Sequence, residues 1–156
     1  MKRFEGSGAA EAPERVFVDT SVWIAHVDAA DPAERHKSAA DALRAHARRL
    51  VTSSYVFDET VTHCARRLGL DVAIQVGEAL LDPRVVDLIE IEPLDEMEAW
   101  KLFRSQPRGR RARDAPASFT DCTSFVLMRR LGLSTALAFD RHFAEQGFLV
   151  PTLAAG

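Results

Sequence analysis

Apolar residues along the chain fall into two kinds of pattern. Short apolar runs favour strands at 16–18, 50–52, 85–91, 135–139 and 148–150. Between them, apolar residues recur at helical spacing and predict helices at 21–27, 32–49, 54–68, 71–81, 95–105 and 119–131, with a short helical turn near 142–143. Strands that alternate with helices indicate an α/β sandwich around a mainly parallel sheet.

Polar residues and glycines mark the expected helix ends. Ser54 and Asp71 are placed to begin helices, and Ser118 is placed to cap the helix that ends before Gly132. Residues 1–14 are rich in Gly, Ala, Pro and Glu, which predicts a disordered arm. Residues 15–156 have the length of one domain.

The composition is that of an ordinary globular protein, with 47% apolar and 28% charged residues. No apolar run is long enough to cross a bilayer, and no apolar stretch follows the basic start, so we expect a cytoplasmic protein. Cys64 and Cys122 lie far apart, without a CxxC pattern. They are therefore expected to be core residues rather than a disulfide or a zinc site.

Four acidic residues stand at positions that favour a shared site. Asp19 and Asp140 each follow directly on an apolar strand, while Glu59 and Asp121 are expected in the first turns of helices. In an open parallel sheet the ligand crevice lies at the carboxyl ends of the strands. The four side chains can therefore converge at this edge of the sheet.

Four converging carboxylates would repel one another unless cations were bound between them. Ligands that offer only oxygen favour a hard cation such as Mg²⁺ or Mn²⁺. Such an ion can polarise a phosphodiester and activate water for in-line attack. The sequence therefore predicts a metal-dependent hydrolase that acts on phosphodiester bonds.

Each acid also has a purely structural interpretation. Ser118 and Asp121 fit a capping box, Asp19 can cap the helix that follows it, and Glu59 can be a first-turn acid favoured by the helix dipole. Taken singly, these interpretations are the simpler ones. The recurrence of acids at the ends of predicted strands favours a common site.

The net charge of −3 is unlike that of most nucleic-acid-binding proteins. The charge is unevenly distributed, however, because residues 104–113 contain five arginines in ten positions. Such a segment can be a solvated surface loop or a phosphate-binding loop. In the second case Arg108, Arg110, Arg111 and Arg113 would hold substrate phosphates without reading the base sequence.

Four segments in this order resemble the PIN-domain family and, within it, the VapC-type toxins of toxin–antitoxin pairs: VFVDTSVWIA, SSYVFDETVTHCARRLGL, SFTDCTSFVLMRRLGL and ALAFDRHFAEQGF. The resemblance implies a three-layer PIN-like sandwich and an endoribonuclease that leaves a 5′-phosphate and a 3′-hydroxyl. It also implies a homodimer, and an antitoxin protein whose basic tail enters the acidic site. The resemblance implies that one or two Mg²⁺ or Mn²⁺ ions bind Asp19, Glu59, Asp121 and Asp140, and that Thr20 or Ser21 helps to hold this pocket.

The chain departs from the fullest family pattern at one position, and the choice between two adjacent acids, Asp58 and Glu59, rests on the resemblance alone. Some relatives carry a further acid after the fourth one, where this chain has Arg141 and His142. Asp58 is adjacent to Glu59, and neighbours on a helix point about 100° apart, so only one of them can face the pocket. The resemblance selects Glu59.

Two other functions fit the sequence less well than the nuclease. An aspartyl-phosphate enzyme of the haloacid-dehalogenase type needs DxDxT, and the chain has Asp19-Thr20-Ser21 with no second acid. A catalytically inactive PIN-like module that binds RNA or protein is disfavoured by the presence of all four acids. The apolar face of residues 95–103 is expected to be either an interface or core, and core is preferred.

Overall fold

The computed structural model describes residues 13–108, 115–151 and 153, so most of the predicted N-terminal arm lies outside the described residues. Its sheet has four strands, all parallel, in the order β3-β2-β1-β4. The predicted mainly parallel sheet is therefore confirmed. The strands are β1 (Val16–Val18), β2 (Leu50–Ser53), β3 (Asp87–Ile89) and β4 (Ala136–Leu137).

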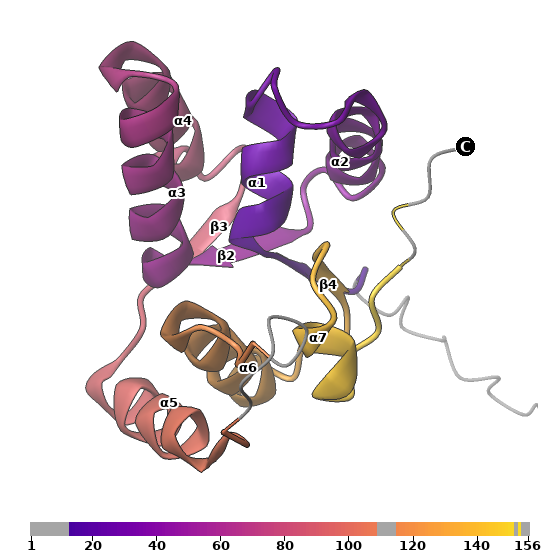
Figure 1. Ribbon diagram of the computed structural model, residues 1–156. Coiled ribbons are helices and arrows are strands. Elements are labelled where there is room, and N and C mark those ends of the chain that lie inside the picture. The colour runs from indigo at the N-terminus through magenta and orange to yellow at the C-terminus, as the bar shows by residue number, and fades with distance from the viewer. Residues whose placement is uncertain (1–12, 109–114, 152, 154–156) are drawn as a thin grey trace, which may run out of the picture.

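Seven helices of the described chain cover the two faces of this sheet (Figure 1). Helices α1 to α4 lie above the strands in that view, and α5, α6 and α7 lie below them. The result is the three-layer α/β sandwich that the resemblance implies. The helices are α1 (Thr20–Val27), α2 (Ala33–Ala45), α3 (Ser54–Arg67), α4 (Leu70–Leu81), α5 (Pro93–Ser105), α6 (Phe119–Leu131) and α7 (His142–Glu145).

The central strand β1 is buried on both faces, as expected for a parallel sheet covered by helices. Phe17 of this strand stacks on Phe143 of α7, with 6.1 Å between the ring centroids. Phe143 in turn meets Phe125 of α6 edge to face at 4.9 Å. These contacts hold the lower helices against the strand that leads to Asp19.

Local hydrogen bonds explain where the helices next to the site begin and end. Ser53 caps α3 by accepting a hydrogen bond from the Val56 amide, and the Ser54 hydroxyl accepts one from the Ile91 amide. Ser118 caps α6, and Gly132 ends it with a left-handed φ of 66°, as the sequence predicts. These ends hold α3 and α6 on opposite sides of the same sheet edge.

The strands are shorter than the apolar runs that predicted them. The predicted strand at 148–150 is wrong as a strand, since it is reduced to a single parallel bridge between Leu149 and Thr135. Runs 85–91 and 135–139 shrink to β3 and β4, because pairing requires a partner strand: β3 pairs only along the short strand β2, and β4 only along the three-residue strand β1. Val86, Ile91 and Ala138, which flank these two strands, are buried although they lie outside the paired residues.

Two helix boundaries also differ. The helix predicted at 32–49 ends at Ala45, and Arg48 takes a left-handed φ of 70° in the turn before β2. The expected cap Asp71 lies inside the first turn of α4, whose N-cap is Gly69 with a φ of 97°. A glycine adopts this φ without strain, which lets α4 begin directly after α3.

The interpretation of residues 95–103 as core holds for only part of the apolar face of α5. Ala99 is fully buried and Leu102 and Phe103 pack against the core, whereas other apolar side chains of this helix are exposed. Leu94, Met97 and Trp100 are 71%, 57% and 54% exposed, while only Asp95 and Ala99 of this helix are buried. Cys64 and Cys122 are free and buried, as predicted. In the described part of the chain, no helix is both long and apolar enough to cross a membrane.

Candidate active site

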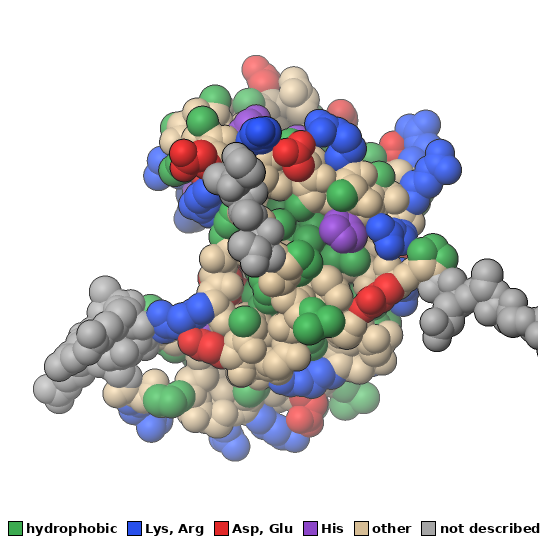
Figure 2. All heavy atoms as spheres, turned by 90° about the vertical axis from the view of Figure 1, so that its right-hand side faces the viewer, with side chains coloured by type: hydrophobic (Ala, Val, Ile, Leu, Met, Phe, Trp, Pro, Cys, Tyr) green, Lys and Arg blue, Asp and Glu red, His purple; other side chains and the backbone are tan. Residues whose placement is uncertain are grey.

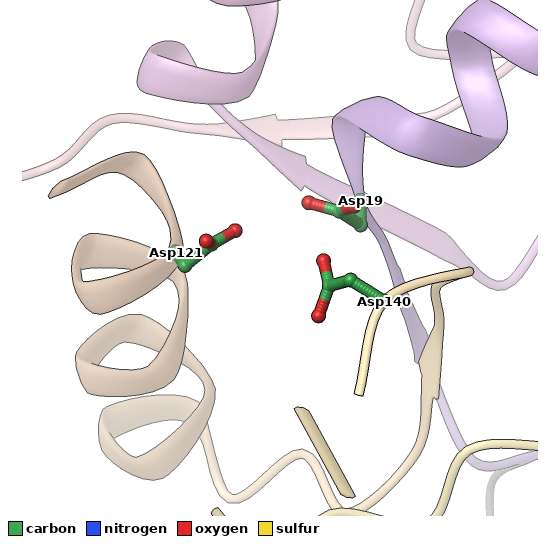
Figure 3. A group of neighbouring side chains, drawn as sticks. All are labelled: Asp19, Asp121 and Asp140. Carbon is green, nitrogen blue, oxygen red and sulfur yellow. The ribbon is translucent and has the colours of Figure 1, made fainter. Parts of the chain in front are cut away.

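Three aspartates meet at the carboxyl edge of the sheet. Asp19 follows β1, Asp140 lies just after β4, and Asp121 projects from the first turn of α6 towards them (Figure 3). Each offers a carboxylate oxygen, and these oxygens all lie within 4.8 Å of one another. Asp19 lies 102 or more positions from the other two in the sequence, and the fold brings all three into one cluster, as the strand-end pattern predicts.

Asp19 is the most deeply buried of the three, at 3% exposure. Its carboxylate accepts hydrogen bonds from the Ser21 amide (3.1 Å) and the Ser21 hydroxyl (2.5 Å), so Asp19 is also the cap of α1. Burial raises the pKa of Asp19 to about 7; the Ser21 hydroxyl lowers it, and the charges of Asp121 and Asp140 raise it. The group is therefore poised to exchange a proton for a cation.

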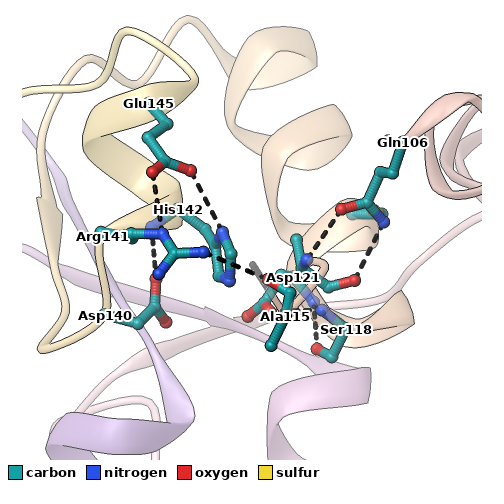
Figure 4. A network of polar contacts seen from close by, with 10 residues as sticks. Gln106, Ala115, Ser118, Asp121, Asp140, Arg141, His142 and Glu145 are labelled. Carbon is teal, nitrogen blue, oxygen red and sulfur yellow. Dashed lines mark hydrogen bonds and ion pairs between the residues drawn. The ribbon is translucent and has the colours of Figure 1, made fainter. Parts of the chain in front are cut away.

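Asp121 has both functions that the sequence suggests. It completes the capping box, because its carboxylate accepts from the Ser118 amide at 2.7 Å while the Asp121 amide donates to the Ser118 hydroxyl at 3.0 Å. The same carboxylate faces Asp140, as seen in Figure 4. The capping box fixes the rotamer of Asp121, which points the carboxylate into the cluster.

Asp140 is half-buried and held by the turn that precedes α7. Its carboxylate accepts a hydrogen bond from the His142 amide at 2.8 Å. Burial raises its pKa, and the charge of Asp121 raises it further, against the opposing effect of the His142 amide. The residue before it, Phe139, donates its amide to the Ser21 hydroxyl at 3.1 Å. Ser21 therefore links the two strand ends that carry Asp19 and Asp140.

Glu59 lies near the cluster but outside the group of three. It is in the second turn of α3, not the first as expected, because the helix already begins at Ser54. Its carboxylate accepts a hydrogen bond from the Thr20 hydroxyl at 2.7 Å. Burial raises the pKa of Glu59, and the charge of Asp121 adds to this, while Thr20 lowers it. Asp58 is exposed, so Glu59 is the residue of the pair that faces the site.

Thr20 and Ser21 use their hydroxyl groups inside the pocket. The Thr20 side chain binds Glu59, and the Ser21 side chain binds Asp19 and the Phe139 amide. These contacts favour a role in holding the acidic residues over direct contact with a substrate.

The donor set suits a hard divalent cation. It consists of carboxylate oxygens alone, at mutual distances that one ion can span, and it offers no thiolate or imidazole. Burial raises the pKa values of Asp19 and Asp140, and the charges of neighbouring acids add to this, so ionisation of both groups is disfavoured in the absence of a cation. A bound cation would supply this balance.

The arginine-rich segment is only partly described. Arg110, Arg111 and Arg113 lie outside the described residues, whereas Arg108 is exposed beside the site. Arg141, the residue after Asp140, was not selected from the sequence; it donates to the Ala115 carbonyl at 3.3 Å and pairs with Glu145 at 2.9 Å (Figure 4). Its position next to a strand-end acid was the signal that could have identified it.

A separate, mainly apolar cavity lies away from the four acidic residues. A cavity of about 520 Å³ is bounded mainly by apolar side chains of α1, α2 and α4, among them Trp23, Leu43 and Leu80. None of the four acids lines it. This cavity is therefore separate from the carboxylate cluster. On the molecular face drawn in Figure 2, acidic and basic side chains are intermixed, so that face carries no uniformly basic surface.

A parallel sheet that gathers three aspartates at its carboxyl edge is the arrangement of a PIN domain, and the chain belongs to the PIN-domain family, whose profile matches residues 16–149. It is 35% identical over 135 residues to the "23S rRNA-specific endonuclease VapC20" of Mycobacterium tuberculosis, in strains CDC 1551 / Oshkosh and ATCC 25618 / H37Rv. The match covers 86% of this chain and 95% of the relative.

The solved structures agree with this assignment. The crystal structure of Mycobacterium tuberculosis VapC20, described as a Sarcin-Ricin loop cleaving toxin, matches with a TM-score of 0.74 at 33% identity. The structural match covers 86% of this chain and 96% of the VapC20 chain. The predicted family and the PIN-like fold are confirmed, and the chain is a homologue of endonucleases of the VapC type.

Proposed function

We propose that this protein is a metal-dependent endoribonuclease, the toxin of a toxin–antitoxin pair, which hydrolyses RNA phosphodiester bonds at the carboxylate cluster. The single observation that carries the proposal is the meeting of Asp19, Asp121 and Asp140 within 4.8 Å at the sheet edge of a PIN domain. The names of the VapC20 relatives make ribosomal RNA the first substrate to test.

The metal that we propose is Mg²⁺ or Mn²⁺, held by the three aspartates. When bound, such an ion polarises the scissile phosphate and lowers the pKa of an attacking water. Ser21 would keep Asp19 oriented and ionised through its hydrogen bond, and the capping box would do the same for Asp121. Glu59, held by Thr20, would orient water or a metal ligand from the second turn of α3.

The partners that we propose follow from the family. A small antitoxin with a basic tail would silence the enzyme by entering the acidic cluster. Two copies of the chain would pair, and the exposed apolar side chains Leu70, Ile74 and Leu81 of α4 offer a surface that pairing could cover. We place the protein in the cytoplasm, where it would meet its RNA and its antitoxin.

The test is cleavage of RNA and of intact ribosomes by the purified protein, with Mg²⁺ or Mn²⁺ and with EDTA, beside the Asp19→Asn variant. Metal-dependent cleavage that is lost in a folded Asp19→Asn protein supports the proposal. Cleavage that persists in EDTA or in the variant would overturn it. A wild-type protein that binds RNA but neither Mn²⁺ nor Mg²⁺ would instead be a non-catalytic binding module.

A further inference from the structure

A concave surface adjoins the carboxylate cluster at the end of α5. Two pockets, of about 350 and 430 Å³, share part of their lining, including Gln106, Arg108 and Pro116, and so form one continuous groove. Trp100 and Arg104 line one end, and Arg141 and His142 line the other. We refer to this surface as the α5–α6 groove.

One end of the groove is lined by residues that are next to a proposed catalytic residue in the chain. Arg141 and His142, which line one end, directly follow Asp140 in the sequence. Pro116, which lines both pockets, is followed closely by the capping box that holds Asp121. A strand whose phosphate lies at the carboxylates would therefore continue along this groove.

The floor of the groove is held by one glutamine. The Gln106 side chain accepts a hydrogen bond from the Ala117 amide at 2.7 Å and donates one to the Ala117 carbonyl at 3.0 Å (Figure 4). This two-way contact fastens the end of α5 to the segment that leads into α6. The contact between the Gln106 side chain and the Ala117 backbone thereby fixes the position of the groove relative to Asp121.

Trp100 presents a rigid aromatic surface at the far end. It is 54% exposed, although its ring stacks on Phe103 with 5.9 Å between centroids and an interplanar angle of 21°. Its ring also meets Phe119, the first residue of α6, edge to face at 6.5 Å. An indole that is supported in this way has little rotamer freedom to lose when a nucleobase stacks on it.

Charge along the groove suits a phosphate backbone. Arg104 lies one helical turn after Trp100 and lines the same pocket, and exposed Arg108 lines both pockets. At the other end, the Arg141 guanidinium is held in place by Glu145. Cations that alternate with an aromatic surface are typical of sites for single-stranded nucleic acid.

We propose that the α5–α6 groove binds an unpaired nucleotide next to the scissile phosphate, with its base stacked on Trp100 and its phosphates held by Arg104 and Arg108. The inference rests on the proposed nuclease function. A base within a duplex is already stacked on both faces, so the groove selects unpaired RNA. Trp100 and Arg104 would thus determine which part of an RNA reaches the carboxylates.

Intrinsic fluorescence can test the stacking directly, because the chain has two tryptophans and Trp23 is only 6% exposed. The probe is a single-stranded oligoadenylate of about twelve nucleotides. It is added to wild-type protein in EDTA and to the Asp19→Asn variant in Mg²⁺, so that cleavage does not interfere. Binding should quench the exposed indole, and Trp100→Phe should abolish the quenching. A duplex of the same length should bind more weakly.

Affinity measured by anisotropy then separates stacking from charge. Trp100→Ala should weaken binding about 5- to 100-fold. Met97→Ala, on the same exposed helix but outside the groove, should leave binding unchanged. Arg104→Gln should reduce the salt dependence of binding by about one phosphate contact. Lys101→Gln is the control, because it removes a cation that is paired with Glu98 on the same helix. This variant should leave the salt dependence of binding unchanged.

Three outcomes would overturn the inference. In the first, the oligoadenylate binds but does not quench the fluorescence, or Trp100→Ala does not weaken its binding. In the second, the oligoadenylate binds neither to the wild type in EDTA nor to the Asp19→Asn variant in Mg²⁺. The third is a dimer that Trp100→Ala converts to monomer while RNA affinity is retained, because Trp100 would then belong to an interface between copies. None of these depends on cleavage, so failure of the groove is distinguishable from failure of the nuclease.

Discussion

The hydroxyl of Ser21 accepts a hydrogen bond from the backbone amide of Phe139 at 3.1 Å, and this contact joins the first turn of α1 to the end of β4. The same hydroxyl donates to the Asp19 carboxylate. One side chain therefore holds together the two strand ends that carry Asp19 and Asp140. The spacing of these carboxylates depends on it.

Ser21→Ala should weaken both the fold and the site. The Phe139 amide would lose its partner, which should lower the free energy of unfolding by about 1–2 kcal/mol. Asp19 would lose a donor that lowers its pKa, so Mn²⁺ binding should weaken as well. Urea unfolding and Mn²⁺ titration measure the two effects. The matched control is Ser105→Ala, whose hydroxyl only meets a carbonyl of its own helix; equal losses in both variants would refute the linking role of Ser21.

Glu59→Gln should reduce RNA cleavage about 10- to 100-fold, the usual effect of altering a group that supports a metal site from outside its ligand set. The amide oxygen can still accept from Thr20, so the free energy of unfolding should change little. Asp58→Asn is the control, because Asp58 is adjacent, carries the same charge and is exposed. Initial cleavage rates measure the difference. If Asp58→Asn were the slower enzyme, the assignment of Glu59 would be wrong.

Stability without metal should fall as pH rises towards neutrality. The pKa of Asp19 is about 7 in the folded chain against an ordinary 3.8, so its contribution is present below about pH 4 and is lost as pH rises through 7. The raised pKa values of Glu59 and Asp140 act in the same direction. A bound cation favours the ionised carboxylates and reverses this loss. Mn²⁺ should therefore raise Tm more at pH 8 than at pH 5.5.

Thermal unfolding at the two pH values, with Mn²⁺ and with EDTA, measures this linkage. The Asp19→Asn variant is the control, since it lacks the group that titrates near 7. Its Tm should respond less to Mn²⁺ at pH 8 than that of the wild type. A larger Mn²⁺ effect at acidic pH would contradict the proposed competition between protons and cations.

Arg130→Ala should destabilise the protein without touching the site. Arg130 makes a two-pronged contact with Asp95, at 2.9 and 2.8 Å, and the Asp95 side chain is only 4% exposed. Removing the arginine leaves a buried carboxylate without its cation; because Arg130 is itself 34% exposed, the cost should be about 1–3 kcal/mol. Arg44→Ala, which breaks an exposed pair with Asp41, should cost less than about 0.5 kcal/mol. Urea unfolding compares the two.

Features that depend on neighbours in the sequence could be predicted well. The capping box of Ser118 and Asp121, the end of α6 at Gly132 and the strand before Asp19 all follow from contacts within a few residues. The alternation of strands and helices then indicated an α/β sandwich, and the strand-end acids indicated a site. The limits of the short strands were less predictable, because an apolar residue beside a strand can be buried without pairing, as Val86 and Ala138 are.

The sequence by itself determined which acids stand at strand and helix ends, because those positions follow from local propensity and capping. Only the tertiary structure decided which of them meet. It brought carboxylate oxygens of Asp19, Asp121 and Asp140 within 4.8 Å of one another. It placed Glu59 outside this group, in the second turn of α3, where Glu59 accepts a hydrogen bond from Thr20. It also exposed Trp100 beside Arg104 and Arg108. These distances depend on how α5 and α6 pack under the sheet, and long-range packing leaves no periodic signal in the sequence.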